Sequence, residues 1–362
     1  MPVALSGVPS PAGGNYTGFG TPVLNAAGEV AFYATLSTSS ATGIFAGNVG
    51  SLQTVALRTS AAPGGGTYTT LNSPFAMNSL GQVAFDATTS GGAGIFAGAP
   101  GSVQSVARIG AVAPGGSTYR TFNGFRSPVL NDAGQVAFYA DLGDGTSTNN
   151  GVFVGAPGAV QLVAKTGTSA SIGGTFSGFL SPVLNGAGQI AVIAGVTNGG
   201  SPTGGLFLSV SGSLQPIALD GTAAPAGGNY HSVASFPGIN SAGQVVFISF
   251  LNGGSSTEGI FSGGLGSVRT VALRGDPAPS GGVYDTFFTP LINSSGMSTF
   301  RAETMDQSFK LGLFEGAPGA VQTVALSGDS APGGAIFSDF TIHNAINGSG
   351  LLVFGANLSG PG

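Results

Sequence analysis

The chain has 362 residues, of which 66 are Gly and 21 are Pro; 42% are hydrophobic and only 6% are charged. A disordered chain lacks this much apolar material, so we expect the glycines to form turns between packed segments. The net charge is −5 and the nine Lys and Arg residues are scattered, which argues against nucleic acid as a partner because binding it requires a basic surface. No apolar run approaches the ~18 residues of a membrane-spanning helix, so we expect no direct membrane insertion, and the absence of Cys excludes disulfides and thiol catalysis.

The first predicted element is a strand at residues 3–7, VALSG, whose sequence recurs at residues 324–328. No signal peptide precedes Pro2, so we expect a mature or trimmed form of the protein. In later copies of the repeat described next, this sequence stands in the fourth strand of a unit.

A turn motif then recurs along the whole chain. An Asn returns every 53–55 residues and a Gly follows it by three positions each time. The spacing N-x-x-G is typical of a type I turn followed by a Gly in the left-handed region, which joins two antiparallel strands. Asn can bond its own backbone two residues on, and Gly takes a positive φ without a Cβ penalty. We therefore predict a structural turn role for Asn25, Gly28, Asn78, Gly81, Asn131, Gly134, Asn185, Gly188, Asn240, Gly243, Asn293, Gly296, Asn347 and Gly350.

Each unit continues in the same order after this turn. A strand such as VAFYA is followed by GIFAG (residues 43–47 and 94–98), a turn rich in Gly and Pro, a strand such as VQTVAL, and an APGG segment. Four short strands in each unit of ~53 residues are typical of one blade of a β-propeller. These strands are apolar at successive positions, which predicts burial on both faces, as in a sheet between two neighbouring sheets.

We therefore predict an all-β fold: a seven-bladed β-propeller of four-stranded antiparallel blades, forming a single domain over residues 1–362. An open β-solenoid is the alternative, because a regular period does not prove closure. The strand at residues 3–7 would complete the last blade and close the ring. GIFAG has six copies, so the last blade is one strand short. Either the chain is truncated before a seventh copy, or another subunit donates the strand and repeated exchange builds a filament.

The seven copies of N-x-x-G-x-x-A-F, as in NDAGQVAF from Asn131 to Phe138, resemble the bacterial secreted choice-of-anchor tandem repeat NxxGxxAF-containing proteins. The resemblance covers essentially the whole chain, and the strand order is similar to that of TolB-type propeller repeats. It implies export to the extracellular space or cell surface, often with a C-terminal sorting or anchoring segment. The low charge favours the same location.

No residue set predicts catalysis, a metal or a cofactor. His231 and His343 lie at different phases of the repeat, outside any metal-binding spacing. The segment Asp141–Gly151 offers oxygen ligands but lacks the pattern of an EF-hand, which favours a solvated loop over a calcium site. Glu303 and Asp306 could pair for acid–base chemistry, yet no orienting partner is visible. We expect a protein that is not an enzyme.

One aromatic residue follows the Gly-Gly of each successive unit. Exposed rings at repeated sites could stack on sugars and form a multivalent lectin, so the candidate ligand-binding residues are Tyr16, Tyr68, Tyr119, Tyr230 and Tyr284. The alternative, which we favour, is that the rings fill the seams between blades, because Phe176 and Phe337 replace Tyr in two units. Glycosylation motifs occur at Asn15, Asn293, Asn347 and Asn357.

The sequence thus predicts a non-catalytic extracellular or cell-surface propeller with a structural or adhesive role, self-assembling into filaments by strand exchange. The alternative is a multivalent glycan-binding propeller. The expected partners are other copies of the chain in the first case and glycans in the second.

Overall fold

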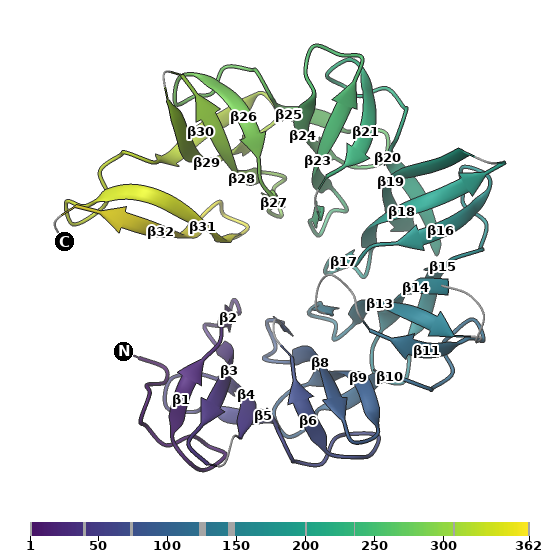
Figure 1. The fold of residues 1–362 in the computed structure, drawn as a ribbon, viewed down its shortest axis with the longest axis vertical. Coiled ribbons are helices and arrows are strands. Elements are labelled where there is room, and N and C mark those ends of the chain that lie inside the picture. Colours follow the sequence, from purple (N-terminus) through teal and green to yellow (C-terminus); the bar gives the residue numbers. More distant parts are fainter. Residues whose placement is uncertain are drawn as a thin grey trace. The chain divides into compact units, whose positions relative to one another are not determined.

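The computed structural model describes residues 2–38, 41–72, 75–122, 128–143, 149–199, 201–234, 236–306 and 308–360. Within these ranges, strands joined by turns repeat six times and a partial seventh copy follows (Figure 1). The chain divides into two compact units. The first unit comprises Met1–Thr168 and Phe176–Gly188, and the second comprises Ser169–Thr175 and Gln189–Gly362.

Each of the six repeats contains the same five strands. A short strand opens the repeat: β1 (Tyr16–Phe19), β6 (Tyr68–Leu71), β11 (Thr118–Thr121), β16 (Thr175–Phe179), β21 (Asn229–Val233) and β26 (Val283–Phe287). A two-residue strand precedes the N-x-x-G turn: β2 (Val23–Leu24), β7 (Ala76–Met77), β12 (Val129–Leu130), β17 (Val183–Leu184), β22 (Gly238–Ile239) and β27 (Leu291–Ile292). A long strand follows that turn: β3 (Val30–Leu36), β8 (Val83–Thr89), β13 (Val136–Gly143), β18 (Ile190–Asn198), β23 (Val245–Asn252) and β28 (Ser298–Met305).

Two further strands complete the repeat. The GIFAG segments and their counterparts form β4 (Thr42–Gly47), β9 (Gly92–Gly98), β14 (Asn149–Gly155), β19 (Ser201–Val210), β24 (Glu258–Gly263) and β29 (Phe309–Ala317). The last strands are β5 (Gln53–Leu57), β10 (Gln104–Arg108), β15 (Gln161–Lys165), β20 (Ser213–Leu219), β25 (Arg269–Leu273) and β30 (Ala320–Leu326). The partial seventh copy contains β31 (Ile336–Ile346) and β32 (Leu352–Ser359).

The strands of a repeat form one antiparallel sheet. In the first repeat the order is β1-β3-β4-β5 and β2 also pairs with β3. Because β2 pairs with Val30 and Ala31 while β1 pairs with the other end of β3, the two short strands are pieces of one interrupted strand. The second, third, fifth and sixth repeats have the same order, which confirms the predicted four-stranded antiparallel sheets. In the fourth repeat, β17 lies in the first unit, and β18, β19 and β20 pair in the second.

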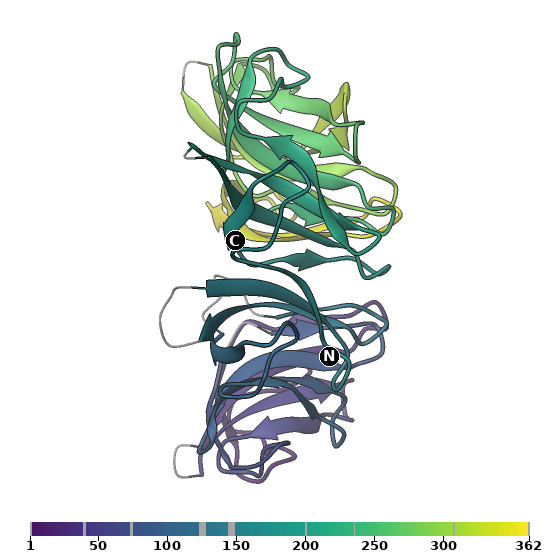
Figure 2. The same cartoon turned by 90° about the vertical axis from the view of Figure 1, so that its right-hand side faces the viewer.

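The hydrophobic core lies between neighbouring sheets. Ala31, Ile44 and Val55 of the first repeat pack with Tyr68 and Phe85 of the second, and the same arrangement occurs between the second and third repeats and between the fifth and sixth. Small Ala residues allow the backbones to approach, and Phe fills the remaining space at the density of a protein interior. Figure 2 shows the twist of the strands within each unit. We call the packed space between two neighbouring sheets a seam.

The predicted N-terminal strand does not form in this structure. Residues 3–7 have no strand partner among the described residues of the first unit. The segment nevertheless occupies the position that the last strand of a repeat has relative to the following short strand. The Gly7 N–H donates to the Tyr16 carbonyl over 2.8 Å, and after β5 the Thr59 N–H donates in the same way to the Tyr68 carbonyl over 2.7 Å. A strand needs an edge to pair with, so the sequence match alone cannot create one. Ring closure through this segment stays a prediction, as does the single domain over 1–362.

Candidate functional site

The N-x-x-G turns are held by the Asn side chain. In the first turn, Asn25 Oδ1 accepts hydrogen bonds from the N–H groups of Ala27 (3.0 Å) and Glu29 (2.9 Å). The Gly of the motif has a positive φ, +82° at Gly28 and +73° at Gly134, which residues with a Cβ rarely adopt. These bonds define the hairpin that enters each long strand.

The Asn amide nitrogen connects one turn to the next. In five steps it donates to the backbone carbonyl of the Asn in the following repeat, and we call this series the asparagine ladder. Its steps are Asn25 to Asn78 (3.0 Å), Asn78 to Asn131 (3.0 Å), Asn131 to Asn185 (3.1 Å), Asn240 to Asn293 (3.0 Å) and Asn293 to Asn347 (3.1 Å). The sequence pattern does not predict these bonds. The one feature of the sequence that hints at them is that the Asn stands at the same position of every repeat.

The residue that follows the Gly is a second connection that the sequence pattern does not predict. Gln82 Oε1 accepts from the Asn78 amide (2.7 Å) and lies against the next turn, where a Cβ added at Gly134 would stand 3.3 Å from it. Gln135 lies in the same way against Gly188, where an added Cβ would stand 2.7 Å from Gln135 Oε1. The Gly is therefore required both for its φ and for the approach of the preceding repeat. In the first repeat a Glu, Glu29, takes the place of this Gln.

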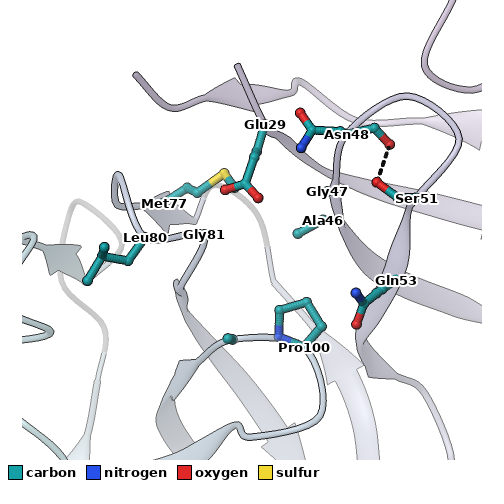
Figure 3. A pocket seen from close by; sticks show the side chains of 11 residues that line it. Glu29, Ala46, Gly47, Asn48, Ser51, Gln53, Met77, Leu80, Gly81 and Pro100 are labelled. Carbon is teal, nitrogen blue, oxygen red and sulfur yellow. Dashed lines mark hydrogen bonds between the residues drawn. The ribbon is translucent and has the colours of Figure 1, made fainter. Parts of the chain in front are cut away.

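A cavity of about 230 Å³ opens beside Glu29, between the first and second sheets (Figure 3). We call it seam pocket 1; its polar and larger apolar lining residues are Glu29, Asn48, Ser51, Gln53, Met77, Leu80 and Pro100. A corresponding cavity of about 190 Å³, seam pocket 2, lies between the second and third sheets. It is lined by Gln82, Ser102, Gln104, Leu130 and Pro157. The two cavities repeat one frame, with a carboxylate in the first and an amide in the second.

Of the tyrosines predicted as ligand-binding residues, Tyr68, Tyr119 and Tyr284 lie in the seams. Tyr16 and Tyr230 pack against Phe side chains of their own repeats. Tyr16, Tyr68, Tyr119, Tyr230 and Tyr284 are only 2–4% exposed. The Tyr119 ring meets the edge of Phe153 at a centroid distance of 5.2 Å, and the corresponding rings pack in the same way. This is the seam-filling arrangement, and in it the rings offer no face to a sugar.

The hydroxyl groups of these five tyrosines are also buried, and they have no hydrogen-bond partner among the described residues. Burial raises the pKa of each of these hydroxyls above the ordinary value. Phe176 is buried at the same position of the fourth repeat without a hydroxyl.

The remaining candidates do not come together as a site. His231 is exposed in β21, and the side chain of His343 lies outside the described residues. Of the Asp141–Gly151 segment, residues 144–148 also lie outside them, and the Asp141 carboxylate accepts from Thr121 Oγ1 and the Tyr139 hydroxyl, both at 2.5 Å. Across the described ranges, no three His, Cys, Asp or Glu side chains are grouped to hold a metal ion.

Two further predictions concern single side chains. In the described part of the chain, no hydrogen bond joins the side chains of Glu303 and Asp306. Asn293, one of the glycosylation motifs, is buried and donates its amide to the ladder, so the folded turn cannot carry a glycan there. No helix long and apolar enough to cross a membrane was found among the residues that the structure describes.

Similar folds occur in several solved propellers. The β-propeller domain of the Trilobed protease from Pyrococcus furiosus matches with a TM-score of 0.50 at 9% identity, over 95% of this chain and 98% of that one. The acylaminoacyl peptidase of Pyrococcus horikoshii matches with a TM-score of 0.50 at 12% identity, over 95% of this chain and 50% of that one. Prolyl oligopeptidase B from Galerina marginata matches with a TM-score of 0.50 at 9% identity, over 95% of this chain and 51% of that one. The chain spans about half the length of these two peptidases.

At these identities the likeness concerns the fold alone, and it places the protein among the all-β propellers with four-stranded antiparallel blades. The chain belongs to DUF7453, a family of unknown function, whose pattern matches residues 2–230 and 89–362. No curated protein matches the sequence. The resemblance to the NxxGxxAF repeat proteins stays an expectation.

Proposed function

We propose that the protein is a non-catalytic propeller with a structural or adhesive role outside the bacterial cell or at its surface. We further propose that copies of it associate by strand exchange. The observation that carries this proposal is the unpaired edge of the last sheet. The low charged fraction of 6% supports a location outside the cell.

Strand β32 is an exposed edge within the described residues, because its one partner is β31. Val353 in β32 is 65% exposed. The residue at this position is at most 1% exposed in each of the six other repeats: Ala31, Ala84, Ala137, Ala191, Val246 and Thr299. An edge strand presents a row of free N–H and C=O groups, which is a template for another strand.

The segment at residues 3–7 has the character of the last strand of a repeat, whereas the strand that β32 lacks is by repeat position a counterpart of β29, which lies between β28 and β30. The sequence of the segment matches residues 324–328, which begin inside β30, and Leu5 is 52% exposed. We propose that this segment of a second copy pairs with β32, so that main-chain hydrogen bonds supply affinity as in other cases of strand addition.

The asparagine ladder supports the same contact. The amide of Asn347 has no acceptor among the described residues, although it accepts three hydrogen bonds through Oδ1. The Asn25 carbonyl accepts the Gly28 N–H in its own turn, but no Asn amide reaches it within those residues. A second copy that extends the last sheet would bring its own Asn25 carbonyl to the Asn347 amide, which adds one more step to the ladder.

Light scattering after size exclusion, with negative-stain electron microscopy, tests this proposal. We expect the native chain to self-associate as its concentration rises, and we expect Leu5→Lys to stay monomeric because a charge on an edge segment blocks pairing. Val8→Lys is the matched control, since Val8 is also exposed, at 44%, but lies outside the segment. Isolated monomeric discs at every concentration would overturn the proposal and show that the ends close within one chain.

Glycan binding is the alternative function. With the five tyrosines buried, a glycan would have to bind through other side chains or through a conformation that exposes the rings. Binding on a glycan array that disappears in Tyr68→Ala and Tyr119→Ala, with the fold intact, would favour this alternative over self-association.

A further inference from the structure

Seam pocket 1 differs from seam pocket 2 in charge. Ser51 and Ser102, Gln53 and Gln104, and Pro100 and Pro157 occupy corresponding places in the two cavities. Glu29 occupies the place of Gln82. A Gln amide both donates and accepts hydrogen bonds, whereas a carboxylate only accepts, so the first cavity favours a ligand that donates.

The Glu29 carboxylate is not neutralised by the protein. Its Oε2 accepts one hydrogen bond from the Asn25 amide (2.8 Å), and Oε1 accepts none from the described residues. No Lys, Arg or His lines the cavity, and the ion pair found in the described ranges, Arg274–Asp285, lies elsewhere. A half-buried carboxylate without a cation attracts positive charge more strongly than one in open water.

The carboxylate is held at the edge of the cavity. A Cβ added at Gly81 would stand 2.7 Å from Glu29 Oε2, so the carboxylate lies directly against Gly81 and only a residue without a side chain leaves room for it there. Figure 3 shows its two oxygens directed into the space that Ala46, Gly81 and Pro100 surround. The position of the charge is therefore set by the asparagine turn on one side and by the next repeat on the other.

The rest of the lining provides apolar surface and further acceptors. The Met77 thioether and the Pro100 ring lie on this cavity, and a Met side chain adapts easily to the shape of a ligand. The Asn48 and Gln53 side chains lie across from Glu29 (Figure 3), and their amide oxygens can accept from a bound donor. An ammonium group carries three donors, which suits a carboxylate oxygen together with an amide oxygen and water.

Other ligand classes fit less well. A divalent cation such as calcium takes six to eight oxygen ligands, and the cavity offers one carboxylate among neutral groups. A sugar ring usually rests on an aromatic side chain, and none lines this cavity. We propose that seam pocket 1 binds a small alkylammonium ligand, a primary amine with a short apolar chain, with the ammonium on Glu29 and the chain against Met77 and Pro100.

Methyl NMR on Met-labelled protein tests this proposal, because the sequence contains only four Met residues. Titration with n-butylammonium chloride is expected to shift the Met77 methyl signal to saturation while the Met297 and Met305 signals stay in place. Glu29→Gln, which keeps an acceptor for Asn25, is expected to weaken binding about tenfold, the loss of one charge-assisted hydrogen bond. Far-UV circular dichroism confirms that the variant is folded.

The matched control creates the charge in the other cavity. Gln82→Glu is expected to raise the number of n-butylammonium sites measured by calorimetry from one to two. An equal Met77 shift with uncharged n-butanol, or unchanged affinity in Glu29→Gln, would overturn the proposal, because either result would show binding to apolar surface alone. A saturable Met77 shift with a neutral monosaccharide and none with n-butylammonium would replace it with a sugar site.

Discussion

The buried hydroxyl of Tyr119 makes a stability prediction that runs against the usual effect of core substitutions. Tyr119→Phe removes the hydroxyl and keeps the ring that contacts Phe153 at 5.2 Å. That hydroxyl is buried and has no partner among the described residues. Burying a hydroxyl without a hydrogen bond is unfavourable by about 1–3 kcal/mol. We therefore expect Tyr119→Phe to raise the free energy of unfolding by about 1–2 kcal/mol.

Urea denaturation followed by far-UV circular dichroism measures this change, provided that the slope with denaturant is the same in both proteins. The reverse substitution is the control: Phe176→Tyr adds a hydroxyl at the corresponding buried position and is expected to lower the free energy of unfolding by a similar amount. If Tyr119→Phe instead lowered it by more than about 0.5 kcal/mol, the hydroxyl would have to be hydrogen-bonded, for example to a buried water, and the reasoning would fail.

Three further predictions concern the same seams and turns. Burial raises the pKa of the Tyr119 hydroxyl above the ordinary 10.0, so its titration leaves the free energy of unfolding unchanged below pH 10 and lowers it by about 1.4 kcal/mol per pH unit between pH 10 and the raised pKa. The free energy of unfolding of Tyr119→Phe should therefore fall less steeply in an alkaline denaturation series. Gly134→Ala forces a Cβ into a φ of +73° beside Gln82 and should lower the free energy of unfolding by about 1–2 kcal/mol in urea. Asn131→Asp keeps the side-chain oxygen that the turn needs but loses the N–H that donates to the Asn185 carbonyl, so it should lower the melting temperature. The Asn347 amide has no acceptor among the described residues, so Asn347→Asp should leave the melting temperature of separate copies unchanged.

The repeat and its strands can be predicted from sequence because they depend on neighbouring residues. The Asn25 side chain bonds N–H groups two and four residues on, and Gly28 takes its positive φ locally, so the motif defines the hairpin without further context. Apolar residues at successive positions likewise indicate strands that are covered on both faces. The four-stranded antiparallel sheets follow from these signals.

The candidate site depends on contacts that local patterns do not contain. The Asn78 amide meets the carbonyl of Asn131, 53 residues away, and Gln82 meets Gly134, so both contacts exist only when neighbouring sheets pack. Tyr119 follows a turn, which fits an exposed connection as well as a seam, and only its pairing in β11 places the ring inside. The strand predicted at residues 3–7 shows the same limit, because strand formation also depends on an available edge.

The asparagine ladder also restricts the symmetry of any assembly that uses it. Every observed step donates from the lower residue number to the higher one, in both compact units. A single ladder contact cannot lie on a twofold axis, because the axis would place amide against amide or carbonyl against carbonyl. A twofold dimer can use the ladder only through two reciprocal contacts, each from Asn347 of one copy to Asn25 of the other. Where each copy instead meets a different partner at each end, the rotation between successive copies determines whether they close into a ring of several chains or continue as a fibre.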